Sequence, residues 1–355
     1  MHALRTATAL FLLLATAAPA GAQGFTIASD SMRLTLGGRV QTIFDTTDAP
    51  GFAATEWALR RVRLEANVRV NRVVSAKIQP EYAGSRVALR DAFVRLDLAP
   101  ALALVAGQAH RPFSLITQTS STRILPIERG VRIRGVAGAR DHASLLAELG
   151  YAERDAGLQA VGAPRGAPLG LSYAAGVFNG PLRGEVPSAS SVQYAARLAL
   201  RPAAGVRVGA AWSHRQFVED PGATRLVLRA GNAWEADVEL GSDRGGPRLV
   251  AEVAAGDTDP FQDARFRAAQ GWLAYRTGPV GSGVSAVEPL LRVSYGDPDA
   301  GGGAILPDVT GGTLVTPGVN LWLGGLNRVA VNWDAWNPDT GESRGSLKVM
   351  FQMAF

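Results

Sequence analysis

The chain has 355 residues, a net charge of +5 and no cysteine, which excludes disulfide bonds, thiolate nucleophiles and thiolate-bound metals. Its length allows two soluble domains or one large barrel. Of the 36 basic residues, only Lys77 and Lys348 are lysines. The excess of arginine suits recognition of phosphate or carboxylate groups, and it is equally compatible with a coding bias toward arginine. The basic residues form no compact tract, so we expect no nucleic-acid partner.

Residues 1–22 predict a secretory signal. Arg5 precedes an apolar run that includes Leu10 to Leu14, and the segment ends in Ala20-Gly21-Ala22, which is typical of a signal cleaved after Ala22. The run is too short for a membrane helix, and no later run approaches the roughly 18 apolar residues that a helix would need. We therefore expect residues 23–355 to be exported.

The clearest strand pattern in the chain lies in Trp57–Val70. From Arg61 onward, polar side chains alternate with apolar ones, and the two-residue period of a strand sorts them onto opposite faces. Such a strand fits a soluble sheet, or a membrane barrel with an apolar outer face and a polar lumen. The stretch is long enough to cross a bilayer at a tilt, which takes about 9–11 residues.

Neighbouring segments show the same alternation and predict an antiparallel meander. Leu34–Phe44 precedes Trp57–Val70, and three further segments follow it: Val74–Tyr82, Ala92–Leu98 and Leu102–Gln108.

The periodicity then breaks from His110 to Arg140. This stretch exceeds the roughly 12–15 residues of an ordinary connection, and such long loops are usually functional. It holds one acid, Glu128, and six arginines: Arg111, Arg123, Arg129, Arg132, Arg134 and Arg140. The sequence therefore concentrates positive charge in one loop, residues 110–140.

Alternation resumes in twelve more segments: Ala143–Tyr151, Ala156–Gly162, Leu169–Phe178, Val192–Leu200, Val206–His214, Leu226–Leu240, Arg248–Gly256, Ala268–Arg276, Val287–Tyr295, Gly318–Leu323, Arg328–Trp336 and Gly345–Phe355. Together with the first five these make seventeen candidates. Bacterial single-chain barrels have an even number of strands. We therefore assign Ala143–Tyr151 to the long loop and predict an all-β, sixteen-stranded antiparallel transmembrane barrel.

The connections and the chain end favour one closed barrel over residues 23–355. Asn71-Arg72 and Gly324–Asn327 are tight turns, whereas Asp257–Arg267 and Gly296–Thr313 are long and rich in glycine, as in outer-membrane barrels. The apolar last strand ends at Phe355 and would be an exposed edge unless it paired with the first strand. Trp322, Trp333 and Trp336 fit an interfacial girdle or, alternatively, core positions.

Several segments, taken in order, resemble the phosphate-selective porin family, porins O and P. They are Arg60-Arg61-Val62-Arg63-Leu64, Ile78-Gln79-Pro80-Glu81, Arg90-Asp91-Ala92-Phe93-Val94, Val105-Ala106-Gly107-Gln108, Arg111-Pro112-Phe113-Ser114-Leu115, Thr119-Ser120-Ser121, Glu128-Arg129, Gly176-Val177-Phe178-Asn179-Gly180 and the terminal Phe355. Each piece is short, and the specificity lies in their order and spacing across most of the chain.

The resemblance implies a trimeric outer-membrane channel whose third long loop folds into the lumen and narrows it. Arg111 to Arg129 would occupy that constriction, with Arg61 and Arg63 on the facing wall. The residue after Ser121 is Thr122 rather than lysine. The resemblance therefore implies a preference for anions more firmly than specificity for phosphate.

The charges support a passive channel for small anions, with phosphate or polyphosphate as candidates, in a lipid bilayer of the bacterial outer membrane. Arginine or lysine rings favour anions. The expected lumen faces of the first strands have a modest excess of basic residues, so the loop must supply most of the preference. The predicted site residues are Arg39, Arg61, Arg63, Lys77, Arg111, Ser120, Ser121, Arg123 and Arg129. Alternatively, these arginines form salt bridges between wall and loop, and the barrel is a plugged structural or surface-interaction protein without transport.

Enzymatic interpretations have little support in the sequence. The histidines are too few and too scattered for a metal cluster, and no phosphate-binding loop or dinucleotide fingerprint is present, so we expect no cofactor. His142 with Ser144, or His214 with Ser213, are the pairs that a serine hydrolase would need. No other feature marks either pair, and we expect no catalytic activity.

Overall fold

The computed structural model describes residues 25–29, 32–83, 86–180, 192–218, 228–259, 263–299 and 309–355. The predicted secretory signal, residues 1–22, lies outside the described residues. Among the described residues, no helix has the length and apolar content needed to cross a membrane.

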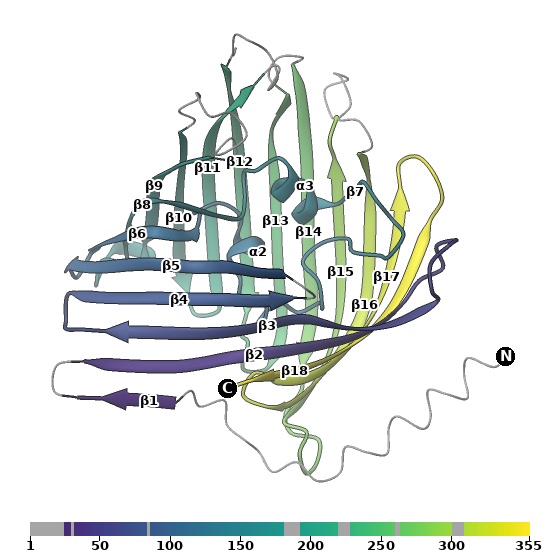
Figure 1. Ribbon diagram of the computed structural model, residues 1–355, viewed down its shortest axis with the longest axis horizontal. Coiled ribbons are helices and arrows are strands. Elements are labelled where there is room, and N and C mark those ends of the chain that lie inside the picture. Colours follow the sequence, from purple (N-terminus) through teal and green to yellow (C-terminus); the bar gives the residue numbers. More distant parts are fainter. Residues whose placement is uncertain are drawn as a thin grey trace.

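Sixteen antiparallel strands form a closed barrel, which confirms the predicted number. Figure 1 shows β2 to β5 crossing in front of the strands of the opposite wall. The barrel closes because β18 pairs with β2. The strands are β2 (Arg33–Thr46), β3 (Thr55–Arg69), β4 (Val74–Ala83), β5 (Arg86–Ala99), β6 (Leu102–His110), β8 (Arg154–Gly162), β9 (Ser172–Phe178), β10 (Gln193–Ala203), β11 (Val206–Val218), β12 (Leu228–Gly241), β13 (Gly246–Asp259), β14 (Ala264–Arg276), β15 (Ala286–Asp297), β16 (Thr310–Gly324), β17 (Asn327–Pro338) and β18 (Arg344–Ala354).

The chain end is tied into the wall, as the apolar terminal strand predicted. Phe355 and Gly38 exchange backbone hydrogen bonds of 2.9 and 3.1 Å. A short strand outside the sixteen, β1 (Phe25–Ala28), pairs with the remaining end of β2. The last strand, β18, is therefore hydrogen-bonded to β2 and is not left as an exposed edge, which would favour edge-to-edge association.

The two faces of β3 separate as its alternation predicted. The Arg61 and Arg63 side chains are buried toward the interior, whereas Leu64 is 49 % exposed on the outer surface. The barrel is thus apolar outside and charged inside on this strand, the pattern of a membrane barrel with a polar lumen.

A β-bulge interrupts this alternation near the middle of β3. Arg61 pairs with Gln41, and the next pair is Leu59 with Thr42, which leaves Arg60 as an extra residue. A bulge lets two successive side chains point to the same side of a sheet. As a result, Arg60 and Arg61 both face the interior, where they share one contact partner.

A second bulge lies two strands away, in β5. Asp91 pairs with Gln79, and the next pair is Leu89 with Pro80, so Arg90 is the extra residue. The two bulges place paired charges, Arg60-Arg61 and Arg90-Asp91, on the same inner wall.

The segment between β6 and β8, residues 111–153, folds inside the barrel and is called the inner loop below. It contains α2 (Leu115–Gln118), β7 (Ala139–Arg140) and α3 (His142–Glu148), which Figure 1 draws between the two walls. Asp141 caps α3 in a reciprocal capping box with Ser144. The candidate strand Ala143–Tyr151 is therefore mostly helix within the loop, and leaving it out of the wall was correct.

Two expectations need correction. Gly318–Leu323 is only the end of β16, because Gly311, Gly312 and Pro317 break the alternation earlier in the strand although it continues to pair. Trp322 and Trp336 point into the interior, and only Trp333 is exposed, at 47 %. Trp322 and Trp336 therefore occupy core positions, the alternative to an interfacial girdle.

A short 3-10 helix, η2 (Pro168–Gly170), precedes β9.

Candidate functional site

Apolar side chains fix the inner loop to one side of the barrel. Ile116, Ile124 and Leu125 pack against inward side chains of β13 to β15, including Trp272 and Leu290. A second cluster joins the start and the end of the loop to β11 to β14. Its members include Phe113, Leu145, Leu146, Tyr151 and Phe266. Buried apolar contacts of this size stabilise the folded loop by several kcal/mol, at roughly 1.5–3 kcal/mol per large side chain. Ile127 also packs against Ile43 of β2, but the loop turns a polar face, with Ser120, Ser121 and Glu128, toward β2 and β3.

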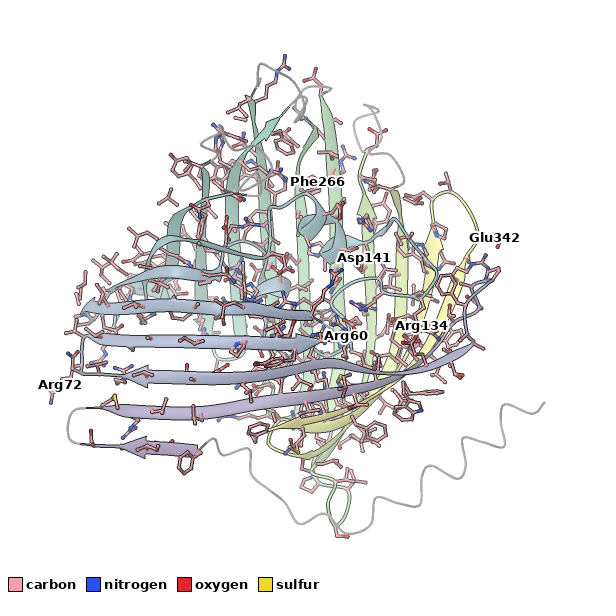
Figure 2. All side chains as sticks on the ribbon, viewed as in Figure 1. Arg60, Arg72, Arg134, Asp141, Phe266 and Glu342 are labelled. Atoms are coloured by element: carbon pink, nitrogen blue, oxygen red, sulfur yellow. The ribbon has the colours of Figure 1, made fainter. Side chains whose placement is uncertain are left out.

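Two cavities lie between this polar face and the wall of β2 to β5. The turn-side cavity, of about 330 Å³, reaches Leu326 in the tight turn between β16 and β17. The loop-side cavity, of about 280 Å³, lies toward the opposite end of the barrel, beside Asp45 and Glu56 at the ends of β2 and β3. Figure 2 shows Arg72, at a tight-turn end of the wall, far along the strands from Arg60 and Arg134, which line the loop-side cavity.

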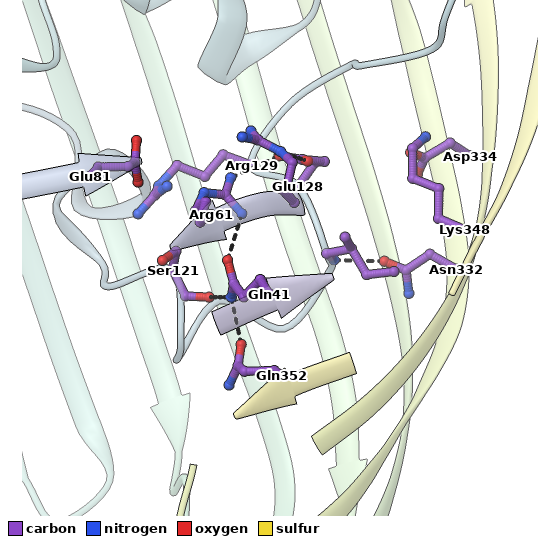
Figure 3. Close-up of polar contacts among 12 residues, drawn as sticks. Gln41, Arg61, Glu81, Ser121, Glu128, Arg129, Asn332, Asp334, Lys348 and Gln352 are labelled. Carbon is purple, nitrogen blue, oxygen red and sulfur yellow. Dashed lines mark hydrogen bonds and ion pairs between the residues drawn. The ribbon is translucent and has the colours of Figure 1, made fainter. Parts of the chain in front are cut away.

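A belt of hydrogen bonds lies between the two cavities (Figure 3). Arg61 Nη1 donates to Gln41 Oε1 at 3.0 Å. Gln41 Nε2 donates to the Ser121 carbonyl at 3.1 Å and to Gln352 Oε1 at 2.6 Å. The belt therefore joins β3, β2, β18 and the inner loop across the space between the loop and this wall.

Glu128 of the inner loop is clamped by two arginines of the wall. Arg60 contacts both carboxylate oxygens, one of them at 2.9 Å, and Arg61 Nη2 donates to the same oxygen at 2.9 Å. Burial opposes the charged form of Glu128, but the guanidinium groups of Arg60 and Arg61 outweigh it and hold its pKa well below the usual range. Glu128 is therefore a buried anion at neutral pH.

A charged cluster on β2 to β5, β8 and the inner loop contains more basic groups than carboxylates, and each of its carboxylates contacts two basic side chains. Glu65 contacts Arg39 and Lys77, and Glu81 contacts Arg63 and Arg90. Asp91 contacts Lys77 and Arg154, and Glu128 contacts Arg60 and Arg61. This shared arrangement neutralises the basic groups only in part, so the cluster keeps a net positive charge.

Two predicted hydroxyl residues lie beside this cluster. Arg39 Nη1 donates to Ser120 Oγ at 3.0 Å and to Ser121 Oγ at 2.9 Å. Arg39, Lys77 and Ser120 line the turn-side cavity together with Arg63. Ser120 Oγ also lies 3.0 Å from Thr122 Oγ1, whereas Ser121 is buried behind the cavity lining.

Arg129 differs from the wall arginines because it bonds only to backbone carbonyls of the inner loop. Its Nε donates to the Ile116 carbonyl at 3.2 Å, and its Nη2 donates to that of Thr119. Within the described ranges, no carboxylate pairs with it. Burial, and next the nearby Arg61, lower the pKa of Arg129 to about 9, so the group still carries its charge at neutral pH.

Two predicted site residues, Arg111 and Arg123, lie outside the cluster of shared carboxylates. Arg111 is buried at the base of the inner loop, where it donates to Gln193 at 2.7 Å and to the Gly150 carbonyl at 2.7 Å. These contacts hold the two ends of the loop together. Arg123 lines the exposed side of the turn-side cavity, 3.2 Å from Asp243, and both side chains are mostly exposed.

Comparison with known families decides the identity of the fold. The family described as phosphate-selective porin O and P matches residues 35–217, more than half of the chain. The chain belongs to this porin family. No protein among the curated sequences matches the porin.

Solved structures similar to this porin are outer-membrane proteins of low sequence identity. OmpT of Vibrio cholerae is 12 % identical, with a TM-score of 0.60 over 93 % of this chain and 100 % of that one. OmpF of Salmonella typhi, solved with daunomycin, is 14 % identical, with a TM-score of 0.59 over 93 % and 100 %. OprB of Pseudomonas putida is 9 % identical, with a TM-score of 0.59 over 92 % and 94 %. These likenesses establish the fold, and together with the family they identify an outer-membrane channel.

Salt bridges join the wall and the inner loop of this porin, with carboxylates on either side of the contact. The alternative interpretation would pair wall carboxylates such as Glu65 and Asp91 with loop arginines, but these two pair with Arg39, Lys77 and Arg154 of the wall. At the clamp the loop instead supplies the carboxylate, Glu128. Three loop arginines pair with carboxylates of the barrel: Arg134 with Asp45 and Glu56, Arg111 with Asp155, and Arg123 with Asp243.

Sequence reasoning missed Arg60, Arg90 and Arg154 as members of the charged cluster. For Arg60 and Arg90 a signal was present, because each makes two charged residues adjacent within an otherwise alternating strand. Such a break in the period indicates a bulge. For Arg154 no local signal exists, because this residue of β8 joins the cluster only through Asp91 of β5, on the other side of β6.

The two candidate hydrolase pairs are not brought together. Ser144 Oγ donates to Asp141, while His142 faces Glu252 of β13 at 3.2 Å. Ser213 is buried inside the barrel, and the adjacent His214 lies on the other face of β11, where it contacts Asn232. Neither pair, as described, has the geometry of a nucleophile and its base.

Proposed function

We propose that this porin is a passive channel selective for small anions. The observation that carries the proposal is the charged cluster in which each carboxylate is shared by two basic side chains. A half-neutralised cluster attracts anions and repels cations along the narrow part of the interior. Arg129 adds a positive charge with no carboxylate partner among the described residues.

The proposed path runs from the loop-side cavity past Glu128 and Arg129 to the turn-side cavity. Arg132 is exposed beside the first cavity, and Arg123 lines the second. Between them an anion would pass Arg61 and Arg63 and then meet Arg39, Lys77 and the hydroxyl group of Ser120. Phosphate is one candidate solute, because the family name and the arginine forks both favour tetrahedral oxyanions.

Efficient conduction requires a weak site, because an anion bound too tightly blocks its own exit. A millimolar dissociation constant, equivalent to about 4 kcal/mol, is the expected regime. The attraction should also weaken as salt rises, since the Debye length falls to about 8 Å near physiological ionic strength.

We also propose export of the chain by residues 1–22, residence in the bacterial outer membrane and assembly as a trimer. A trimer form of OmpT from Vibrio cholerae is among the structures with a similar fold. Cross-linking of the porin in intact outer membranes tests the trimer, because a monomer alone would exclude it.

Reversal potentials across a planar bilayer with a KCl gradient test the channel proposal. We expect a potential of the sign for chloride permeation, and cation selectivity would falsify the proposal. The second candidate function is a plugged structural barrel, which the belt of Gln41, Ser121 and Gln352 favours. It predicts no conductance, so regular single-channel steps would count against it.

A further inference from the structure

The clamp around Glu128 has the geometry of a ligand site. The Arg60 guanidinium lies side-on to the carboxylate and contacts both oxygens, and Arg61 adds a third contact. A bidentate fork of this kind is how arginine recognises a planar carboxylate. Here the carboxylate that fills the site belongs to the protein itself.

The cavity beside the clamp has a mixed character. Arg60, Glu128 and Arg132 line the loop-side cavity together with the apolar side chains of Ile43, Ala58 and Ile133. Its other lining residues are already paired, Asp45 and Glu56 with Arg134, and Lys348 with Asp334. The cavity has a volume of about 280 Å³. A charged fork next to an apolar wall suits a ligand with a carboxylate head and a short alkyl tail better than it suits a bare inorganic ion.

The backbone that carries Glu128 is anchored separately from its side chain. Arg292 Nη1 donates to the Glu128 carbonyl at 2.8 Å, and Ile127 N donates to Asn332 Oδ1 at 2.7 Å. These bonds fix the loop to β15 and β17. Removal of the Glu128 carboxylate therefore empties the clamp while the backbone keeps its attachments.

From this geometry we propose that Arg60 and Arg61 form a binding site for small monocarboxylates, which Glu128 occupies as an internal competitor. A permeating carboxylate exchanges with the Glu128 side chain at the arginines, and Glu128 keeps the site from holding the solute too tightly. The inference rests on the proposed channel function and narrows its solute class. Glu128 then acts as a specificity-determining residue rather than only as a link between loop and wall.

The decisive variant is Glu128→Ala, tested with acetate as the probe. Truncation at Cβ removes a group with the size and charge of acetate, so acetate can refill the clamp. Single-channel chloride current is measured in planar bilayers while acetate is titrated at constant ionic strength. The thermal unfolding midpoint in detergent is measured in parallel, because it reports binding without requiring conduction.

Glu81→Ala is the matched control. Glu81 is also buried and also pairs with two arginines, Arg63 and Arg90, but it lines neither cavity. We expect acetate to block chloride current and raise the midpoint in Glu128→Ala at roughly tenfold lower concentration than in Glu81→Ala, a difference of about 1.4 kcal/mol. Propionate should bind at least as well as acetate, and formate and phosphate more weakly, because only the alkyl acids use the apolar wall.

Each result has a distinct meaning. Equal acetate effects in the two variants would show general attraction to freed arginines and would overturn the carboxylate site. No acetate effect in a folded, conducting Glu128→Ala channel would overturn the site and leave the anion channel intact. If wild type and variants all fail to conduct, the channel proposal fails, while acetate-dependent stabilisation of Glu128→Ala still supports the site. If Glu128→Ala does not fold, Glu128→Gln replaces it: higher anion permeability supports Glu128 as competitor, and unchanged permeability refutes it.

Discussion

The charge of Arg129 should have a larger effect on ion selectivity than any other single loop arginine. Its guanidinium bonds to two backbone carbonyls and pairs with no carboxylate in the part of the chain that the structure describes. One unit charge about 4 Å from an ion is worth about 1 kcal/mol in water and about 4 kcal/mol at an effective dielectric of 20. We take the lower figure, because salt in the lumen of a conducting channel screens the interaction.

The charge acts with opposite sign on anions and cations, so its loss should change the anion-to-cation permeability ratio by about 2 kcal/mol, or roughly 30-fold. Arg129→Gln removes the charge, and Arg129→Lys keeps it while losing the forked bonds. Arg123 is the control, since its partner Asp243 and its exposure predict a change below about twofold for Arg123→Gln. Reversal potentials in a KCl gradient give the ratios. Equal shifts for Arg129→Gln and Arg129→Lys would refute an electrostatic origin, and an unchanged ratio in Arg129→Gln would remove the residue from the selectivity filter.

Three further predictions concern the inner loop and the wall. The pKa of Glu128 in the folded protein lies below its ordinary value of 4.5. The carboxylate therefore contributes its full stability above pH 4.5, and this contribution is lost as the pH falls through the lower pKa of the folded state. In denaturant unfolding, wild type should lose more stability than Glu128→Gln on acidification, and parallel losses would contradict this. Ile116→Ala should weaken docking of the loop on Trp272 by about 2–5 kcal/mol, visible as added current noise and faster proteolysis of the loop, whereas the exposed control Arg123→Ala should change neither. Deletion of Arg60 removes the bulge but keeps the inner and outer faces of β3 in register, so the barrel should still fold. Deletion of Ala66 moves the side chains beyond it to the opposite face and should prevent folding in detergent. Equal yields of the two folded variants would refute the bulge assignment.

The alternating pattern was sufficient to predict the wall of the barrel. It placed Arg61 and Arg63 inside and Leu64 outside, and it identified the inner loop as the place where the period fails. These features depend only on neighbours along one strand, and a local pattern contains them. The even strand number of barrels then excluded the segment that forms α3.

The contacts within the site could not be predicted in the same way. Glu128 meets Arg60 across 68 positions of sequence, and no local period connects them. The inside–outside alternation of β3 also shifts by one residue at Arg60. Alternation counted from Trp57 therefore assigns the residues from Arg61 onward to the wrong face. The inward placement of Trp322 follows from its bond to Glu288 on the neighbouring strand, at 2.9 Å, which again is a contact between strands.

Under the proposed function, the ratio of bases to carboxylates accounts for a wall that is stable and still selective for anions. Arginines without partners would repel one another inside a narrow barrel and would hold a passing anion too firmly. Arginines paired one to one with carboxylates would leave no field to separate anions from cations. Sharing each of Glu65, Glu81, Asp91 and Glu128 between two bases fixes the guanidinium groups in place and leaves part of their charge to the lumen. The two bulges supply the additional arginines, Arg60 and Arg90, that make this ratio possible on strands where strict alternation would face them toward lipid.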